Sequence, residues 1–380
     1  MRIGFVSDVV YPWNKGGVEA TEALEMRSLA KRHEVYCFSM QFKGMRKEFV
    51  RDRIHYITVA NTAKRGIYTE GGTRSINAAR LFAEALPEAL DMHRLDVLQV
   101  NAFPYLHLRA SKRYCSRTNC KLVLDVAEVW DRRRWAEYLG TLRGSMAHYY
   151  LRLAQALNGA DAYIANSSTT KAGLGRLGVS SSKIHVFSPV LSGSIMRSRH
   201  SSRRSMNVIV SGRLIKEKRF DMWIEAVAKA HALRGSITGT IMGDGPERAA
   251  LDARIMGLHL ERCMRVLPFA KSKAGLYKRI AGSGLLLQTS GREGLSAIVL
   301  ESLALGTPVL LPSDTPIPDE VKSMCVLSKP EDLPNRIVEI LGSSNRKKYL
   351  PSRSALRQFS SSAILGFYSS LFQKLGLERK

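Results

Sequence analysis

Short apolar segments of strand length alternate with longer amphipathic segments along almost the whole chain, and this alternation constrains the fold more than any other feature. Residues 3–7 are strand-sized and apolar, and residues 18–31 follow with apolar side chains at helical spacing, among them Ala20, Leu24 and Leu29. Short buried strands that alternate with amphipathic helices form a parallel sheet covered on both faces. The sequence therefore predicts an α/β fold.

The alternating pattern runs through the chain twice. One series occupies residues 1–188 and another occupies residues 206–350, and a Ser- and Arg-rich stretch without apolar periodicity separates them at 189–205. A length of 380 residues is comfortable for two domains. We expect two Rossmann-like parallel-sheet domains that face a central cleft, joined by a linker. Residues 351–380 end in a helix that we expect to pack back on the first domain.

Two glycines, Gly16 and Gly17, stand between the first expected strand and the first expected helix. Glycines at such a position let backbone N–H groups approach a phosphate at the helix N-terminus. A strand-to-helix turn needs glycine for structural reasons as well, so the purely structural alternative stays open. The loop lacks the full G-x-G-x-x-G pattern, which disfavours a nicotinamide cofactor.

A basic loop follows the first strand of the second series. Arg213 and Lys218 lie between an expected strand at 207–210 and a helix that begins near Asp221. Cations at the start of a helix suit a departing diphosphate, because its negative charge grows as the bond to it breaks. The alternative is a basic loop that only faces solvent.

Two glutamates flank the start of another expected helix. Ser296 can cap a helix over residues 297–305, with Glu293 in the preceding loop and Glu301 inside the helix among apolar side chains. A carboxylate in such surroundings costs free energy unless it meets a polar partner. The pair fits a sugar nucleotide, with hydroxyls on the acids and phosphate on the helix N–H groups. The alternative is that Glu301 makes a structural ion pair.

The order of these motifs resembles glycosyltransferase family 4. The matching motifs are Gly-Gly-x-Glu, Gly-Arg-Leu-x5-Phe, Gly-Asp-Gly-Pro-Glu from Gly243, and Glu-x7-Glu followed by Ala-x-Gly-Thr-Pro-Val, and they extend from residue 1 to about residue 312. The resemblance implies the GT-B fold, an acceptor-side N-terminal domain and a C-terminal domain that binds a nucleotide sugar. It also implies transfer with retention of anomeric configuration and without a metal.

The same resemblance assigns roles to individual residues. Arg213 and Lys218 would hold the donor diphosphate, Glu293 would contact the donor sugar, and Glu301 would contact the nucleotide ribose. The residues expected to be catalytic are Arg213, Lys218 and Glu293. The residues expected to bind the donor are Gly16, Gly17, Arg213, Lys218, Gly243, Glu293, Gly294, Leu295, Ser296 and Glu301. The sequence shows no Asp-x-Asp motif and no cluster at metal-ligand spacing, so we expect no cofactor and no metal.

One position departs from the family pattern. Where many members carry a histidine followed by Asp, this chain has Ala127 and then Glu128. The departure keeps two rivals open, a non-catalytic member that binds nucleotide sugar or lipid as a partner subunit and a nucleotide-sugar epimerase on the same fold. Because Glu293 and Glu301 are both present, we expect a hexosyltransferase that acts on a glycan, lipid-linked or small-molecule acceptor.

The formal net charge of +25 is spread over both series and suggests an anionic partner, although no nucleic-acid-binding motif accompanies it. Residues 131–143 mix cations with aromatic side chains and can lie on anionic lipid or receive a lipid-phosphate acceptor. The alternative is a partly buried helix with a basic outer face. The residues expected on this acceptor or membrane side are Glu128, Trp130, Arg132, Arg133, Arg134 and Trp135.

Hydropathy bears on where the chain is located. No apolar run approaches the ~20 residues that span a bilayer, and the first residues are too short and too polar for a signal peptide. We therefore expect a cytoplasmic protein, with peripheral attachment to the cytosolic face of the membrane as a further hypothesis.

Overall fold

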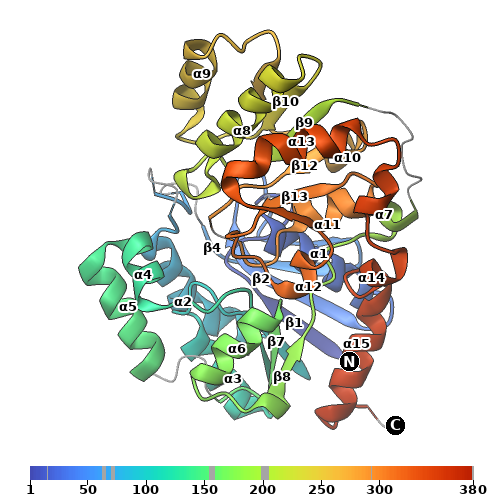
Figure 1. Ribbon diagram of the computed structural model, residues 1–380. Coiled ribbons are helices and arrows are strands. Elements are labelled where there is room, and N and C mark those ends of the chain that lie inside the picture. Colours follow the sequence, from blue (N-terminus) through green and yellow to red (C-terminus); the bar gives the residue numbers. More distant parts are fainter. Residues whose placement is uncertain are drawn as a thin grey trace. The chain divides into compact units, whose positions relative to one another are not determined.

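The computed structural model describes residues 1–14, 16–61, 66–69, 73–153, 159–197, 205–291 and 293–378. The chain folds into two compact units (Figure 1). Unit 1 comprises Met1–Val190 together with Ser361–Lys380, and unit 2 comprises Leu191–Ser360.

The sheet of unit 1 has eight strands in the order β3-β4-β2-β1-β5-β6-β7-β8. All neighbouring pairs are parallel except β3 and β4, which form an antiparallel edge. The strand bounds are β1 Arg2–Val6, β2 Glu34–Gln41, β3 Glu48–Arg51, β4 Ile54–Asn61, β5 Val97–Asn101, β6 Lys121–Val126, β7 Ala162–Ala165 and β8 Ile184–Val186. The predicted parallel α/β sheet is confirmed for this unit.

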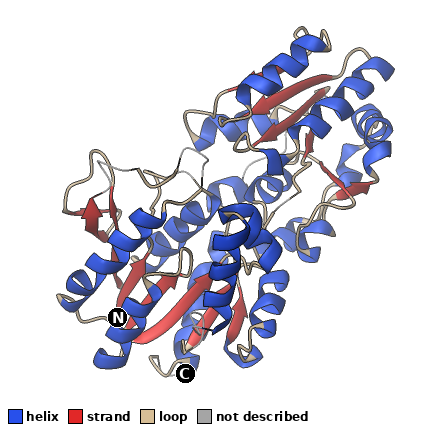
Figure 2. Ribbon diagram, turned by 90° about the vertical axis from the view of Figure 1, so that its left-hand side faces the viewer, coloured by secondary structure: helices blue, strands red, loops and turns tan. Residues whose placement is uncertain are grey.

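Helices cover both faces of this sheet (Figure 2). Alternate residues of a strand point to opposite faces, so Phe5 of β1 joins a core with α1 and α15, and Val6 joins a core with α2 and α3. The described helices of unit 1 are α1 Gly17–Leu29, α2 Ile76–Asp91, α3 Leu108–Thr118, α4 Arg132–Leu139, α5 Thr141–Leu153, α6 Ser168–Arg176 and α15 Ile364–Lys374.

The sequence pattern predicts a single long helix over residues 133–157, and this prediction is wrong at Gly140, while residues 154–157 lie outside the described residues. Gly140 separates α4 from α5 with a φ of +84°, a conformation that glycine adopts without the strain a side chain brings. Gly144 then lets α5 approach α4, because a Cβ there would lie 2.3 Å from the carbonyl oxygen of Trp135. The two glycines thus make a tight helical hairpin from one amphipathic stretch.

The sheet of unit 2 has six parallel strands in the order β11-β10-β9-β12-β13-β14. Its strands are β9 Asn207–Ser211, β10 Thr238–Met242, β11 Met264–Leu267, β12 Leu285–Leu287, β13 Val309–Pro312 and β14 Val326–Ser328. The described helices are α7 Gly193–Arg197, α8 Phe220–Leu233, α9 Arg248–Gly257, α10 Lys273–Ala281, α11 Ala297–Ala304, α12 Asp319–Lys322, α13 Leu333–Gly342 and α14 Arg353–Arg357. This second parallel sheet also agrees with the predicted fold.

The segments expected as a linker and as a C-terminal extension have more structure than their composition suggests. Within 189–205, α7 forms and its Ile195 is buried in unit 2, while residues 198–204 lie outside the described residues. Within 351–380, α14 belongs to unit 2 and α15 belongs to unit 1. On α15, Tyr368 and Phe372 are buried in the core that contains α1.

Three carboxyl groups lie between α1, the sheet and α15 in unit 1. Glu22 and Glu25 of α1 are buried, and Asp125 of β6 is partly buried. Gln99 Nε2 donates to Glu25 at 3.1 Å and to Asp125 at 3.5 Å, and the Tyr368 hydroxyl donates to Gln99 at 2.7 Å. Burial and then repulsion from Asp125 raise the pKa of Glu25 to about 8, and burial raises the pKa of Asp125 to about 7.

This buried cluster predicts a pH-dependent stability that Glu25→Gln should reduce. A carboxyl whose pKa is raised on folding holds its proton more tightly in the folded state. The free energy of unfolding therefore falls as the pH rises from the ordinary glutamate pKa of 4.5 to about 8. Glutamine cannot ionise. We expect Glu25→Gln to melt at a higher temperature than the wild type at about pH 9 and at a similar temperature at about pH 5.

Exposed Glu88 on α2 provides the matched control. Glu88→Gln should leave the difference in melting temperature between the two pH values unchanged. If Glu25→Gln showed the same pH dependence as the wild type, the buried carboxyl would not be held neutral in the way its surroundings indicate.

Candidate functional site

Lys218 and Glu293, two of the residues expected to be catalytic, meet in unit 2. A short 3-10 helix at Lys216–Lys218 follows β9, and its Lys218 Nζ lies 2.7 Å from Glu293 Oε1. Gln288, which follows β12, donates a short hydrogen bond to the same oxygen. Both side chains of the ion pair are largely shielded from solvent. The carboxyl ends of β9 and β12 therefore hold a cation and an anion in one preorganised pair.

Backbone contacts fix the loop that carries Lys218. The hydroxyl of Thr289 donates to the carbonyl oxygens of Lys218 and Arg219 at 3.1 and 3.0 Å. The N–H of Gly291 donates to the carbonyl oxygen of Glu217 at 2.8 Å. Gln288 and Thr289 were not among the residues predicted from the sequence. Their position directly after a buried strand and before Glu293 was the signal that could have indicated them.

Arg213 and Gly243 differ in what surrounds them. Arg213 is exposed near the start of the loop that leaves β9. Gly243 packs on that loop, since a Cβ there would lie 2.0 Å from the carbonyl oxygen of Gly212. In the turn that starts at Gly243, the carbonyl oxygen of Asp244 accepts a hydrogen bond from the backbone N–H of Leu214 at 2.9 Å. Close backbone packing accounts for glycine at this position, while Arg213 is accessible to a ligand.

Glu301 is only 4% exposed on α11 and has two polar partners from α10. Lys273 Nζ lies 3.1 Å from its Oε1, and the Tyr277 hydroxyl donates to the same oxygen at 2.8 Å. The ion pair that the sequence left open as an alternative is therefore present. Lys273 and Tyr277 were missed from the sequence, although their spacing of four residues places both on one face of a helix.

The expected N-cap role of Ser296 is wrong. Its φ is +62°, in the left-handed region, and its side chain makes no capping hydrogen bond. An N-cap residue needs extended backbone to turn its hydroxyl toward the first N–H groups of the helix. Ser296 Oγ is buried without a hydrogen-bond partner among the described residues. Gly294 and Leu295 lead into this strained residue, and such strain is found preferentially at ligand-binding sites.

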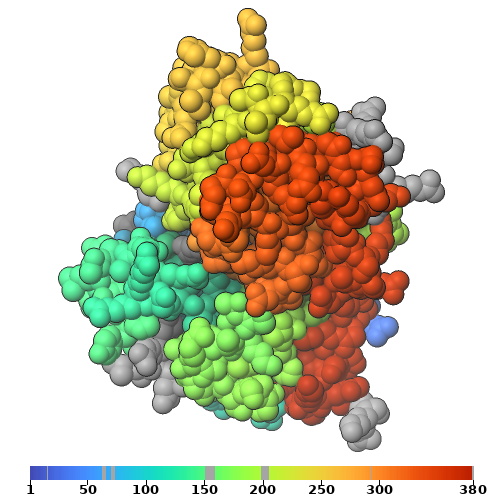
Figure 3. Space-filling model, viewed as in Figure 1, coloured from blue at the N-terminus to red at the C-terminus, as the bar shows by residue number. Residues whose placement is uncertain are grey.

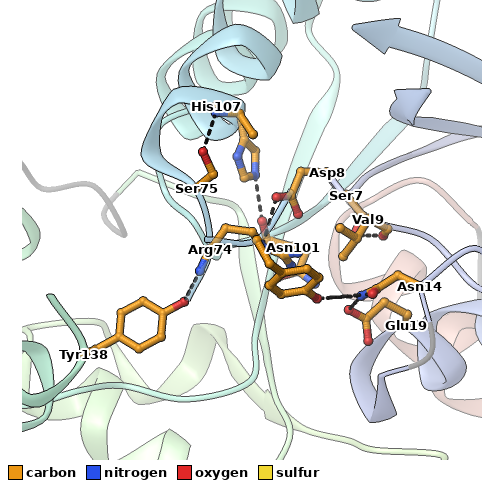
Figure 4. A network of polar contacts seen from close by, with 12 residues as sticks. Ser7, Asp8, Val9, Asn14, Glu19, Arg74, Ser75, Asn101, His107 and Tyr138 are labelled. Carbon is orange, nitrogen blue, oxygen red and sulfur yellow. Dashed lines mark hydrogen bonds and ion pairs between the residues drawn. The ribbon is translucent and has the colours of Figure 1, made fainter. Parts of the chain in front are cut away.

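Unit 1 has a second polar centre where β1 ends (Figure 4). Buried Asp8 lies 3.3 Å from Arg74, and the Arg74 guanidinium lies 4.8 Å from the centre of the Tyr68 ring. Asn14 connects the Tyr68 hydroxyl, at 3.0 Å, to Glu19, at 2.6 Å. Burial raises the pKa of Asp8 to about 6, and Arg74 opposes that effect. The centre lies at the carboxyl edge of the sheet, where open α/β folds bind ligands.

The two predicted glycines lie beside this centre. Gly17 is the first residue of α1, and Gly16 precedes it. A Cβ on Gly16 would lie 1.9 Å from the carboxylate of Glu19, so the close approach of that side chain requires glycine. Neither Asp8 nor Arg74 was predicted from the sequence, because Arg74 precedes α2 and is 66 positions further along the chain.

The aromatic residues expected at a membrane surface point into unit 1 instead. Trp135 is 4% exposed, and its ring meets the Trp130 ring at a centroid distance of 4.8 Å. Trp130 Nε1 donates to Glu128 at 2.5 Å, and its ring contacts Tyr138. Arg132 and Arg133 are exposed and Arg134 is partly exposed. The prediction of lipid-facing tryptophans is therefore wrong for Trp135, because the apolar face of α4 packs against the core.

Among the residues that the structure describes, no group of three or more His, Cys, Asp or Glu side chains has an arrangement that could hold a metal ion. In the same residues, no helix combines the length and the apolar character that crossing a bilayer requires.

The chain matches two families of known proteins. Residues 15–190 match the family described as Glycosyltransferase Family 4, and residues 195–357 match the family described as Glycosyl transferases group 1. Each match therefore falls within one of the two structural units.

Individual relatives support the same grouping. The GDP-mannose-dependent alpha-(1-6)-phosphatidylinositol dimannoside mannosyltransferase of Mycobacterium tuberculosis is 23% identical over 358 residues, which are 92% of this chain and 90% of that protein. The alpha-monoglucosyldiacylglycerol synthase of Acholeplasma laidlawii is 24% identical over 176 residues, or 44% of each chain.

Solved structures show the same fold. Anabaena HepE, crystallised with UDP and glucose, has a TM-score of 0.71 at 16% identity and covers 98% of this chain and 99% of its own. Sucrose-phosphate synthase from Thermosynechococcus elongatus has a TM-score of 0.75 at 15% identity, with 98% of both chains covered.

Proposed function

The chain is a glycosyltransferase of family 4 with the GT-B fold, and on this premise we propose that it moves a sugar from a nucleotide-sugar donor to an acceptor hydroxyl with retention of configuration. The observation that carries this proposal is the Lys218–Glu293 pair at the carboxyl ends of β9 and β12, with Gln288 on the same carboxylate. The cation can bind the diphosphate of such a donor, and the carboxylate next to it can accept hydrogen bonds from hydroxyls of the sugar. The pair therefore suits the point where diphosphate and sugar are joined.

Each residue of this group has a proposed role. Lys218 has three N–H donors, so it can bind Glu293 and a phosphate oxygen together. It would neutralise charge on the departing diphosphate, with accessible Arg213 as a second cation. Glu293 would accept hydrogen bonds from hydroxyls of the donor sugar. Glu301, which Lys273 and Tyr277 hold in place, would accept a hydrogen bond from a hydroxyl of the ribose.

We propose that no divalent metal takes part. Two cations and the N-terminus of α11, approached through Gly294, Leu295 and Ser296, would supply the positive charge that a metal supplies elsewhere. Residues Gly16 and Gly17 would lie on the phosphate side in unit 1.

The relatives suggest donors and acceptors to test. The mycobacterial relative is named for GDP-mannose and a phosphatidylinositol dimannoside, and the Acholeplasma relative for a glucosyldiacylglycerol. HepE was solved with UDP and glucose. We propose a hexose donor of the UDP or GDP class and a lipid-linked or other glycan acceptor for this chain.

A screen of nucleotide sugars by thermal denaturation tests the donor proposal. A ligand that binds only the folded state raises the melting temperature, so UDP-glucose or GDP-mannose should raise it, in buffer that contains a chelator. Transfer of the labelled sugar to a lipid extract, with the anomeric configuration of the product read by NMR, tests the reaction. Manganese-dependent activity would contradict the metal-free proposal, and loss of the sugar to water alone would contradict transfer.

The alanine at position 127, where many family members have a histidine, is the observation that favours the rival, a non-catalytic partner subunit. The carbonyl oxygen of Ala127 accepts a hydrogen bond from the Thr170 hydroxyl at 3.0 Å, so this position has a backbone role in unit 1. A chain that binds a nucleotide sugar but yields no new product with any acceptor would support the rival. An epimerase would instead change the sugar without an acceptor.

We propose that unit 1 docks on an anionic membrane surface through α5, in place of the tryptophans of α4. Leu142, Met146 and Tyr149 are 77%, 65% and 61% exposed at helical spacing, which makes one apolar stripe. Three exposed arginines lie near this stripe in the sequence, namely Arg132 and Arg133 of α4 and Arg143 of α5. The α4–α5 segment, teal to green in Figure 3, lies on the surface of the molecule.

Vesicle sedimentation tests this docking surface. Each arginine near an anionic leaflet contributes about 1 kcal/mol, so the chain should bind anionic vesicles at low salt and release them as salt rises. Leu142→Ser combined with Met146→Ser should weaken binding several-fold, because it removes the apolar stripe. The control is Leu233→Ser, which changes another exposed leucine, 61% exposed on α8 of unit 2. Equal binding to neutral and anionic vesicles would contradict the proposal.

A further inference from the structure

A cavity of about 870 Å³ opens at the amino end of the sheet in unit 1. Its walls come from the start of β1, the turn between α1 and β2, the segment before β5 and the end of α3. The residues that line it are Met1, Arg2, Arg32, His33, Glu34, Arg94, Leu95, Asp96, Arg117 and Thr118. The Asp8–Arg74 centre follows the other end of β1, about 17 Å away for a strand of five residues, so the cavity is separate from the candidate site.

The two acids in the cavity wall are engaged in local structure. Glu34 pairs with Arg2 Nε at 3.1 Å and accepts a hydrogen bond from the Tyr36 hydroxyl. Asp96 accepts a hydrogen bond from the backbone N–H of Arg2 at 2.7 Å. These bonds join β1 to the starts of its two neighbours, β2 and β5. The acids thus hold the rim of the cavity together.

The arginines exceed these acids in number. Four arginines and two acids give the side chains of the lining a formal charge of +2 when His33 is neutral. Arg117 pairs with Asp91 outside the lining at 2.5 Å. Arg32 and Arg94 are exposed, and no carboxylate of the described residues lies within ion-pair distance of either. Two arginines without an ion-pair partner among the described residues therefore line one cavity.

The chemistry of this lining identifies a class of ligand. A guanidinium binds a phosphate through two parallel N–H donors, and two of them around one cavity match a ligand with more than one phosphate. Leu95 and Met1 are the only aliphatic side chains of the lining, and His33 packs its ring against Phe372 of α15 at 5.9 Å. The lining thus offers little surface for an acyl chain or a nucleobase.

We propose that this cavity is a second anion site, which binds a small polyphosphate through Arg32 and Arg94. The volume is within the usual range of ~300–1,000 Å³ for small-ligand pockets. The site does not depend on the proposed transfer reaction, since it uses none of its residues. Binding would link the turn after α1 to the segment before β5 and so stabilise unit 1.

Calorimetric titration with inorganic triphosphate tests the site in the full-length chain. The background carries Arg213→Ala and Lys218→Ala, so that the proposed donor site does not bind the probe. We expect saturable binding of one triphosphate in this background. Adding Arg32→Ala and Arg94→Ala should weaken it at least tenfold, whereas adding Arg80→Ala and Arg113→Ala, which remove two exposed arginines outside the cavity, should leave it unchanged.

Two further measurements distinguish a specific phosphate site from general electrostatic attraction and from a site for a lipid headgroup. Arg32→Lys with Arg94→Lys keeps the charge but loses the two-pronged geometry, and we expect it to weaken triphosphate binding several-fold. Equal losses in the cavity variant and the control variant would overturn the proposal. So would binding of vesicles with phosphorylated inositol lipids through Arg32 and Arg94 without binding of free triphosphate.

Discussion

Lys218→Ala is expected to lower the rate of sugar transfer at saturating donor by at least tenfold, about 1.4 kcal/mol or more of barrier. The reason is that Lys218 Nζ lies 2.7 Å from Glu293 and would contact the diphosphate as negative charge develops on it. The same change leaves Glu293 largely buried, with Gln288 as its remaining polar partner among the described residues, which raises the free-energy cost of its charge. Steady-state kinetics with a labelled donor measure the effect.

Lys216→Ala is the matched control for this variant. Lys216 belongs to the same 3-10 helix and is exposed, so its loss should leave the rate near that of the wild type. Thermal denaturation of both variants separates a catalytic loss from unfolding. If Lys218→Ala and Lys216→Ala had the same activity, the loop after β9 would be a basic surface and Lys218 would have no role in catalysis.

Glu301→Gln is expected to weaken donor binding by about tenfold or more, since a hydrogen bond to a charged group contributes ~1.5–3 kcal/mol. Glutamine has the same shape and keeps an oxygen for the Tyr277 hydroxyl, but it removes the charge that attracts Lys273. Glu301 is only 4% exposed, so solvent screens its charge little and the loss of that charge has a large effect on the free energy of binding. Calorimetric titration with the nucleotide sugar measures the change.

A purely structural role of Glu301 predicts a different result. In that case the variant would lose stability, while its affinity for the nucleoside diphosphate would remain that of the wild type. Glu331→Gln changes an exposed acid of the same unit and controls for the loss of one negative charge. Unchanged donor affinity in Glu301→Gln would remove the assignment to the ribose.

Patterns that repeat along the chain carried the prediction of the fold. Alternate positions of β1 do face two different cores, with Phe5 on one and Val6 on the other, as a buried strand requires. Trp223, Ile224 and Val227 are likewise at helical spacing, and all three are buried on α8, where the sequence predicts a helix that begins near Asp221. These successes share a cause, because periodicity records which face of an element is buried and needs no knowledge of its neighbours.

Local patterns failed where backbone conformation depends on contacts. Ser296 has the residue type of an N-cap, yet its backbone is left-handed and its hydroxyl is buried. Residues 133–157 have the pattern of one helix, yet Gly140 turns the chain and Gly144 closes the hairpin. In each case the preference of the segment alone is weaker than the packing around it.

The sequence by itself determined the two-domain α/β architecture and the order of the motifs that place Lys218, Glu293 and Glu301 at strand ends and helix starts. Only the tertiary structure decided their partners: Glu301 meets Lys273 and Tyr277, Asp8 meets Arg74, and Trp135 points inward. Strand and helix periods arise from neighbouring residues, whereas these pairs join segments far apart in the chain. Their contacts exist because two packed elements bring them together, and no spacing rule encodes that geometry.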